Sequence, residues 1–126
     1  MVNDHLSDLI SRIRNGYRAG KRVLEANLTR PSLQVAKILV EEGYLEKIEE
    51  SEGKLILSLK YNGKKPALMG IRRVSKPGAR IYRGARELPR VFGALGKNIL
   101  TTPKGIMIDK KARKENVGGE IIAQVW

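Results

Sequence analysis

The sequence contains no cysteine and only one histidine, His5, and these absences exclude two common kinds of site. Without cysteine the chain can form neither a disulfide framework nor a cysteine-based zinc site. A single histidine close to the N-terminus cannot build a His-based catalytic triad or a His-rich metal site. The glycines form neither a GxGxxG unit between a strand and a helix nor a P-loop of the GxxxxGKS type. We therefore expect a protein that is not an enzyme and that takes no metal, no cofactor and no small-molecule substrate.

Long apolar runs are also lacking. No stretch of the sequence is apolar over the length of a membrane span, and the first residues lack the basic and then apolar pattern of an export signal. These absences predict a protein of the cytoplasm with no membrane partner. The matrix of an organelle is the alternative compartment.

Acidic residues are scarce in one half of the chain. Overall, 25 Lys and Arg residues oppose 13 Asp and Glu residues, which gives a net charge of +12. Residues 1–62 hold ten basic and nine acidic side chains, whereas residues 63–126 hold fifteen and four. A general solubilising role gives no reason for this segregation. A polyanionic partner does, because basic side chains displace the counterions condensed on phosphate groups. The pattern predicts nucleic-acid binding, with an anionic membrane surface as the alternative.

Two helices are expected in the half with balanced charge. Residues 4–19 predict an amphipathic helix with Asn3 as its N-cap. Its apolar stripe consists of Leu6, Leu9, Ile10, Ile13 and Tyr17. Residues 30–42 predict a second helix, which Thr29 can cap and which Pro31 can open without losing a hydrogen bond.

The rest of the half with balanced charge is expected to form strands. A short strand is expected around residues 23–24, and residues 44–48 and 55–61 predict a hairpin. Glutamates crowd this hairpin, so it is a poor surface for phosphate groups. We expect it to face away from a polyanion.

The basic half has the pattern of short strands. These strand patterns cover residues 68–74, 80–83, 99–100, 106–108 and 120–126. A helix is expected over residues 88–95, and Asp109 is the expected cap of a basic helical turn that runs to Lys114. We therefore predict an α+β fold of two small packed lobes. An N-terminal helix–strand–helix–hairpin lobe covers residues 1–62, and a mostly β lobe that binds the polyanion covers residues 63–126.

The strongest chemical signal is a basic stretch in the second half. It contains Arg72, Arg73, Lys76, Arg80, Arg83, Arg86 and Arg90, with one acid, Glu87, and one aromatic side chain, Tyr82. Arginine offers planar bidentate donors to phosphate, and a tyrosine can stack on an exposed base. The stretch predicts an RNA-binding surface. A solvated charge run around a buried Tyr82 is the alternative.

Two glycine-containing segments are further candidates. The first consists of Thr101, Thr102, Pro103, Lys104 and Gly105, and the second consists of Gly118, Gly119 and Glu120. Hydroxyls and a lysine suit a sugar–phosphate backbone, and a hydroxyl can bind the 2′-OH that distinguishes RNA from DNA. An ordinary polar turn is the alternative. Paired glycines permit close approach of a ligand, and the carboxylate of Glu120 either buttresses an arginine, which the basic surroundings favour, or accepts from a base.

Several segments of the chain follow one another in an ordered pattern, namely residues 8–15, 41–44, 73–78, 87–91 and 118–122. Together they resemble the family of the eighth protein of the small ribosomal subunit, in its bacterial or organellar form. The most specific segment runs from Gly96 to Arg113, where apolar pairs, a hydroxyl–threonine pair, a glycine and a small–basic pair follow in the order of the family signature. The resemblance covers essentially the whole chain.

The resemblance implies a primary rRNA-binding protein of the central domain, which helps to assemble the platform beside neighbouring small-subunit proteins. In the family, the hydroxyl loop and the Gly-Gly-Glu segment contact rRNA, and the N-terminal lobe adds backbone contacts. The candidates for the latter are Arg12, Arg14, Asn15, Thr29 and Arg30. Many bacterial members also repress their own operon by binding its mRNA. An RNA chaperone or translational regulator outside the ribosome is the alternative function.

The sequence departs from the family pattern at two places. The loop that commonly reads Ser-Thr-Ser reads Thr101-Thr102-Pro103, so one hydroxyl is missing and the proline fixes its own φ near about −65°. The second helix usually opens with a Ser-Lys pair, and Thr29-Arg30 stands in that region. Thr102 is the loop residue to which the family contact transfers most directly.

The segregated charge predicts a steep salt dependence. Affinity for small-subunit rRNA should fall as monovalent salt rises, because each phosphate that a basic side chain neutralises releases condensed counterions. Filter binding between roughly 50 and 200 mM salt measures the slope, which reports the number of phosphates neutralised. A flat response over this range would contradict the charge argument.

Overall fold

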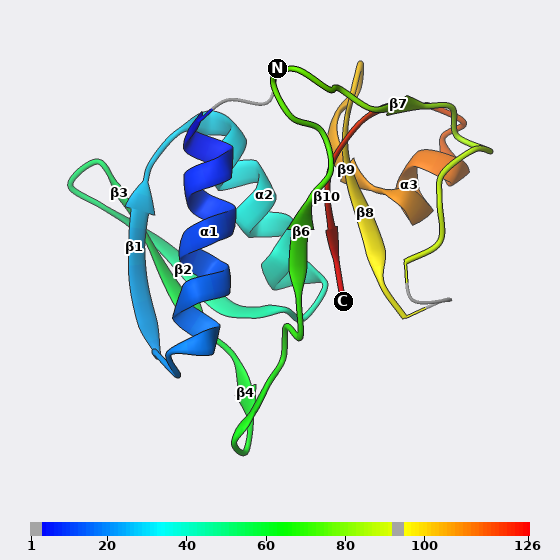
Figure 1. Cartoon of the computed structure of the whole chain (residues 1–126). Coiled ribbons are helices and arrows are strands. Elements are labelled where there is room, and N and C mark those ends of the chain that lie inside the picture. The colour runs from blue at the N-terminus through cyan, green and yellow to red at the C-terminus, as the bar shows by residue number, and fades with distance from the viewer. Residues whose placement is uncertain (1–3, 92–94) are drawn as a thin grey trace. The chain divides into compact units, whose positions relative to one another are not determined.

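The computed structural model describes residues 4–91 and 95–126, which form two compact units (Figure 1). The first unit extends to Met69, and the second runs from Gly70 to Trp126. Helices and strands occur in both, and the second unit is mostly β, which confirms the expected α+β class. The boundary expected after Asn62 stays a prediction.

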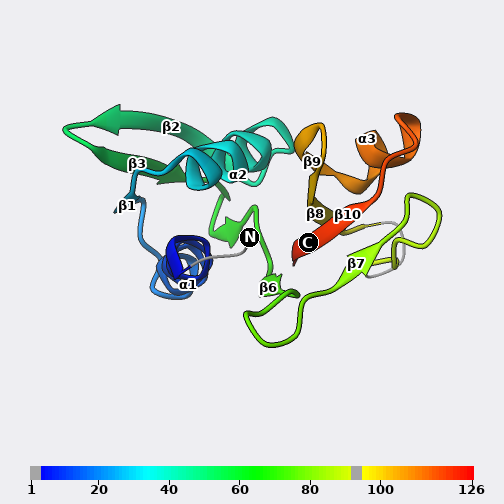
Figure 2. The same cartoon turned by 90° about the horizontal axis from the view of Figure 1, so that it is seen from above.

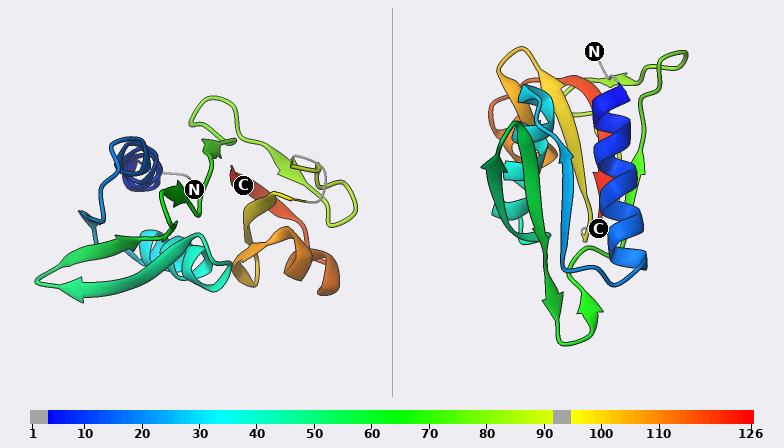
Figure 3. Two further views of the ribbon diagram at one scale, coloured as in Figure 1. Left: turned by 90° about the horizontal axis from the view of Figure 1, so that it is seen from below. Right: turned by 90° about the vertical axis from the view of Figure 1, so that its left-hand side faces the viewer.

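The first unit is a three-stranded antiparallel sheet with two helices. Its elements are α1 (Asp4–Arg18), β1 (Val23–Asn27), α2 (Arg30–Glu41), β2 (Leu45–Ser51) and β3 (Lys54–Leu59), followed by the small hairpin β4 (Tyr61–Asn62) and β5 (Lys65–Pro66). The strands of the sheet lie in the order β1-β3-β2. Both helices cover one face of this sheet (Figure 3), and the alternating burial along β3 matches that arrangement.

The helices of the first unit form for the reasons that the sequence indicates. All five residues of the apolar stripe of α1 are buried. Thr29 has extended backbone angles and its side chain accepts a hydrogen bond from the Ser32 amide at 3.2 Å, which confirms it as the N-cap of α2. Gly43, with a φ of +83°, follows the helix end. The N-cap expected at Asn3 lies outside the described residues.

The buried hydroxyl of Tyr17 joins α1 to the residue before β2 and to the residue between β3 and β4. The hydroxyl donates to the Tyr44 carbonyl at 2.5 Å and accepts from the Lys60 amide at 3.0 Å. Its ring meets the Tyr61 ring edge to face, with 5.5 Å between the centroids. Burial is the main cause that raises the pKa of Tyr17 above its ordinary value. The sequence shows Tyr17 only as part of an apolar stripe.

The second unit is built around its last strand. Its elements are β6 (Ile71–Arg73), β7 (Tyr82–Arg83), β8 (Lys97–Thr102), β9 (Gly105–Ile108), α3 (Asp109–Lys114) and β10 (Gly119–Val125). The sheet has the order β6-β10-β8-β9, and β7 also pairs with β10 (Figure 2). All of these pairs are antiparallel, with a register shift in the β8–β10 pair between Ile121 and Ala123.

One face of this sheet holds the apolar core of the unit. Leu100, Met107 and Ile121 are cross-strand neighbours, and they pack in one cluster with Ala112 of α3 and with Leu88. Because the cluster joins α3 to three strands, it holds the short helix against the sheet.

Beside the apolar cluster runs a chain of buried polar groups. The Asn98 side chain donates to the Pro89 carbonyl at 2.7 Å and to the Asp109 carboxylate at 2.9 Å, and it accepts from the Gln124 amide at 3.0 Å. The Gln124 carbonyl in turn accepts from Arg72. Buried polar side chains need such partners, because an unpaired one costs about 1–3 kcal/mol. The chain links β6, β10, β8 and α3.

Two expectations for this unit were wrong. Leu88 to Val91 adopt no helix, whereas the rest of the expected helix at 92–94 lies outside the described residues. The physical reason is tertiary: Leu88 belongs to the core cluster and the Pro89 carbonyl binds Asn98. Asp109 does not cap α3 but is its first residue, and its carboxylate binds Asn98 and the Lys110 amide instead. Every helix in residues 4–91 and 95–126 is too short or too polar to serve as a membrane span.

Removing the Tyr17 hydroxyl should destabilise the first unit. Tyr17→Phe leaves the Lys60 amide without its acceptor, so we expect a loss of about 1–3 kcal/mol. Because the folded tyrosine has the higher pKa, its stabilising effect is complete below about pH 10 and is lost as the pH rises further. Denaturant unfolding at neutral and alkaline pH measures both effects. A Tyr17→Phe protein as stable as the original at neutral pH would contradict the role of this hydroxyl.

Candidate RNA interface

Three motifs that are far apart in the sequence meet at the start of β10. Glu120 pairs with Tyr82 of β7 on one side and with Thr101 of β8 on the other, and Gly119 pairs with Arg83. Directly opposite residues of antiparallel strands point to the same face, with their Cβ atoms about 4.5–5.5 Å apart. Tyr82, Glu120 and Thr101 therefore form one row across the neighbouring strands β7, β10 and β8. We call this set the Tyr82–Thr101 row.

Glycine is required where β10 enters the sheet. A Cβ atom on Gly119 would lie 2.1 Å from the Thr101 carbonyl oxygen, and one on Gly118 would lie 2.5 Å from the Arg83 carbonyl oxygen. Both neighbours are backbone atoms, which cannot move aside as a flexible side chain can. The paired glycines thus allow β10 to approach β7 and β8 closely, whereas the sequence pattern predicts the close approach of a ligand.

The hydroxyl of Thr102 closes the hairpin between β8 and β9. It donates to the Gly105 carbonyl at 2.8 Å and accepts from the Lys104 amide at 3.1 Å, while Gly105 has a φ of +115°. The hydroxyl is therefore part of the turn. The neighbouring Thr101 is half-buried, and its hydroxyl has no hydrogen-bond partner among residues 4–91 and 95–126. Thr101 is the loop residue with a hydroxyl available to a ligand.

The remainder of this loop is exposed. Pro103 and Lys104 form its tip, and the Lys104 ammonium lies 3.8 Å from the Glu115 carboxylate. Such an exposed pair contributes little to stability, and its lysine can still turn to a phosphate.

Tyr82 offers an open aromatic face at the edge of the row. The residue is 59% exposed, so the alternative that the basic stretch surrounds a buried Tyr82 is wrong. Arg80 and Arg83 beside it are exposed too, and Arg83 donates to the Tyr82 carbonyl at 2.8 Å. Lys76 lies exposed in a turn that its two backbone hydrogen bonds with Ala79 close. Cations therefore flank an aromatic ring that is free to stack.

Arg72 and Arg73 have partners within the unit. The Arg72 guanidinium donates to the Gln124 side chain, at one end of the buried polar chain. The Arg73 guanidinium donates to the Ser75 carbonyl at 2.7 Å, and its Nη2 atom is buried without a hydrogen-bond partner in the described structure. These two arginines help to hold β6 in place.

Glu120 is buried in the middle of the row. Only 3% of the residue is exposed, and its Oε2 atom has no hydrogen-bond partner in the described part of the chain. No ion pair joins it to an arginine among these residues, so both roles expected for this carboxylate stay predictions.

The candidate RNA-binding residues of the first unit lie on α1 and at the start of α2. Arg12 is held by Asp8 at 2.7 Å and by the Glu25 carbonyl at 3.1 Å, and it lines a shallow groove together with Asn15. Arg14, on the same helix, is half-buried. Thr29 caps α2, with its hydroxyl donating to Ser32 at 2.9 Å, and the exposed Arg30 follows it.

No group of His, Asp and Glu residues in the described ranges could hold a metal ion.

Residues 4–126 match the sequence profile of the family described as Ribosomal protein S8. The chain belongs to this family. It is 45% identical to the small ribosomal subunit protein uS8 of Ruminiclostridium cellulolyticum over 129 residues, which cover 99% of this chain and 98% of the relative.

Further relatives in the family show similar agreement. Identity is 43% over 131 residues to the protein of the same name from Nostoc punctiforme, with 99% of this chain and 98% of the relative covered. It is 44% over 133 residues to the small ribosomal subunit protein uS8c of Chlorokybus atmophyticus, with both chains covered completely. These matches confirm the resemblance in the sequence. The relatives are named as ribosomal proteins and not as enzymes, which confirms the expectation of a non-enzymatic protein.

The steric role of Gly119 gives a test of this geometry. Gly119→Ala places a methyl group against the Thr101 carbonyl, so the strands must separate and we expect a loss of about 1–3 kcal/mol. Gly78→Ala is the matched control, because nothing lies within 4 Å of its added Cβ. Thermal unfolding of the two variants measures the difference. Equal stabilities would contradict the close approach of β10 to β8.

Proposed function

We propose that this chain is a structural component of the small ribosomal subunit that binds the central domain of small-subunit rRNA directly. Its relatives are named as small ribosomal subunit proteins, and they match it over nearly its whole length. The excess of basic residues in the second half supports an RNA partner, since a polyanion balances that charge. Neighbouring small-subunit proteins are further proposed partners, on a ribosome of the cytoplasm or of an organelle.

The observation that carries this proposal is the exposed ring of Tyr82 at one end of a cross-strand row that has Thr101 at its other end and Glu120 between them. Sequence-specific RNA recognition uses stacking on aromatic side chains and hydrogen bonds to base edges and 2′-hydroxyls. The row offers a ring for the first interaction and a free hydroxyl for the second. Arg80 and Arg83 beside the ring suit the phosphates that flank a stacked base.

The other candidates have supporting parts in this proposal. Thr102, Gly105, Gly118 and Gly119 set the backbone around the row, and Pro103 and Lys104 form the exposed tip beside it. Arg72, Arg73 and Lys76 belong to the strand and turn that lead to the row. The candidates of the first unit would add contacts to the RNA backbone, which position a protein without reading sequence.

The same row would bind any mRNA that reproduces the rRNA site. Repression of the protein's own operon is therefore a second consequence that we propose. Its ligand chemistry is identical, so a variant that loses the rRNA site should lose the mRNA as well.

Thr101→Val tests the row, because it keeps the β-branched shape and the net charge and removes only the hydroxyl. Loss of a hydrogen bond to RNA in a desolvated interface should cost about 1–3 kcal/mol, roughly five- to 150-fold in affinity. Binding to an unrelated RNA duplex should not change, because that binding depends on charge. The measurement is the affinity for a central-domain rRNA fragment and for the duplex at one salt concentration.

Thr101→Ser is the matched control, since it restores the hydroxyl and should restore the preference for the rRNA fragment. Thr102→Val serves as a second comparison. It removes the bonds that close the turn, so it should lower thermal stability as well. If folded Thr101→Val keeps its full preference for the rRNA fragment, Thr101 does not read the RNA.

A further inference from the structure

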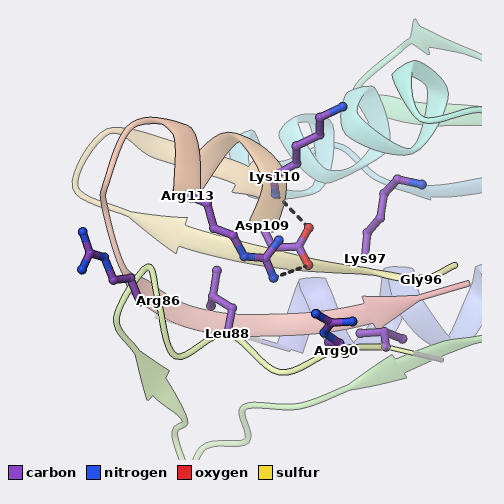
Figure 4. A pocket seen from close by; sticks show the side chains of 9 residues that line it. Arg86, Leu88, Arg90, Gly96, Lys97, Asp109, Lys110 and Arg113 are labelled. Atoms are coloured by element: carbon purple, nitrogen blue, oxygen red, sulfur yellow. Dashed lines mark hydrogen bonds and ion pairs between the residues drawn. The ribbon is translucent and has the colours of Figure 1, made fainter. Parts of the chain in front are cut away.

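We propose that the second unit binds RNA at a second place, a cationic pocket that takes phosphate groups of the sugar–phosphate backbone without reading sequence. This proposal rests on the proposed function for the identity of the polyanion. The pocket has a volume of about 610 Å³ and lies between the start of β8, helix α3 and residues 86–91 (Figure 4). It shares no residue with the Tyr82–Thr101 row.

The lining of the pocket is strongly basic. Five cations line it, namely Arg86, Arg90, Lys97, Lys110 and Arg113, against the single acid Asp109. In Figure 4, Asp109 and Arg113 face each other near the middle, and the other four cations are spread around them.

The charge of Asp109 is already balanced within the protein. One carboxylate oxygen accepts from the Asn98 amide at 3.1 Å and from the Asn98 side chain at 2.9 Å, and the other accepts from the Lys110 amide at 2.9 Å. The Arg113 guanidinium lies 3.7 Å from the same carboxylate. Asp109 therefore shapes the pocket and pairs with Arg113, and it does not neutralise the whole basic lining.

Three of the lining cations are available to a ligand. Arg86, Arg90 and Lys110 are exposed, and their side chains make no hydrogen bond or ion pair with any residue in 4–91 or 95–126. Like charges held around one pocket repel one another and attract counterions. A phosphate group that replaces those counterions gains the free energy of their release. A polyanion with regularly spaced phosphates fits this arrangement.

The floor of the pocket suits a sugar–phosphate chain rather than a base. Leu88 and Val91 add an apolar part to the lining, and Gly96 packs closely against Val91, because a Cβ there would lie 2.4 Å from Val91. The described lining contains no aromatic ring to stack a base and no hydroxyl to read one. The pocket should therefore bind RNA without preference for sequence.

The pocket and the row lie at opposite ends of β8. Lys97 begins this strand and lines the pocket, whereas Thr101 belongs to the row. Four residues of a strand span about 13 Å. The two places therefore bind different phosphates, and the pocket adds affinity that does not depend on the row.

The test compares two triple variants with the same change of net charge. The pocket variant carries Arg86→Gln, Arg90→Gln and Lys110→Gln, and the control carries Lys37→Gln, Lys47→Gln and Lys54→Gln, three exposed lysines of the first unit. Salt titrations with a central-domain rRNA transcript and with an unrelated RNA duplex measure the slope of log affinity against log salt. Thermal unfolding checks that both variants fold.

We expect the pocket variant to lower the slope by about two to three on both RNAs, close to one for each phosphate that the protein no longer neutralises. The control should change the slope by less than about one, and neither variant should change the preference for the rRNA transcript. Equal slopes for the two variants would overturn the proposal that the pocket binds phosphate groups. The proposal would also be overturned if the pocket variant kept the slope of the unaltered protein but failed to join small subunits, because an acidic protein segment would then occupy the pocket.

The outcome separates this proposal from the proposed function. If the unaltered protein shows no preference for the rRNA transcript, the proposed function is wrong. The slope measured on the duplex then still shows whether the pocket binds phosphate groups. If the preference is present and the pocket variant behaves like its control, the proposal for the pocket is wrong and the proposed function stands.

Discussion

The close approach of β10 to β7 and β8 is the constraint on which the candidate interface depends. Only glycine fits at positions 118 and 119, because a Cβ atom there would collide with backbone atoms of the neighbouring strands. With this approach, Tyr82, Glu120 and Thr101 lie in one row although they come from three separate motifs. A further requirement is the turn that Thr102 closes, since it ends β8 next to the row.

Buried polar bonds support the other end of the same sheet. The chain from Arg72 through Gln124 and Asn98 to Asp109 links three strands and α3, and Asp109 also faces Arg113 in the cationic pocket. Each of these groups is satisfied by a partner from another element, so the network is specific to one arrangement of the unit. The sheet thus positions two basic surfaces with different chemistry, one with an aromatic ring and a hydroxyl and one with cations alone.

The helices of the first unit could be predicted from the sequence because their signals are local. The apolar stripe of α1 and the cap at Thr29 depend on neighbours within a few residues. The segment at Leu88 has a similar local pattern, yet the core and the Asn98 side chain hold it in another conformation. The site residues were predictable by type, whereas their meeting at β10 and the use of the Thr102 hydroxyl within the turn depend on strand pairing far apart in the chain. The cationic pocket could not be predicted from the sequence either, because its lining residues are far apart in the chain, although Arg86 and Arg90 belong to the basic stretch.

If the start of β10 and its two neighbouring strands form the surface that reads RNA, their backbone amides should respond when RNA binds. Amide chemical-shift mapping of the isotope-labelled chain, titrated to saturation with a central-domain rRNA fragment, measures this response. We expect the largest shifts at Tyr82 and Arg83, at Thr101, Thr102, Lys104 and Gly105, and at Gly118 to Glu120, with small shifts in the acidic hairpin of β2 and β3. Largest shifts in that hairpin, with the start of β10 unaffected, would show that the RNA is read elsewhere.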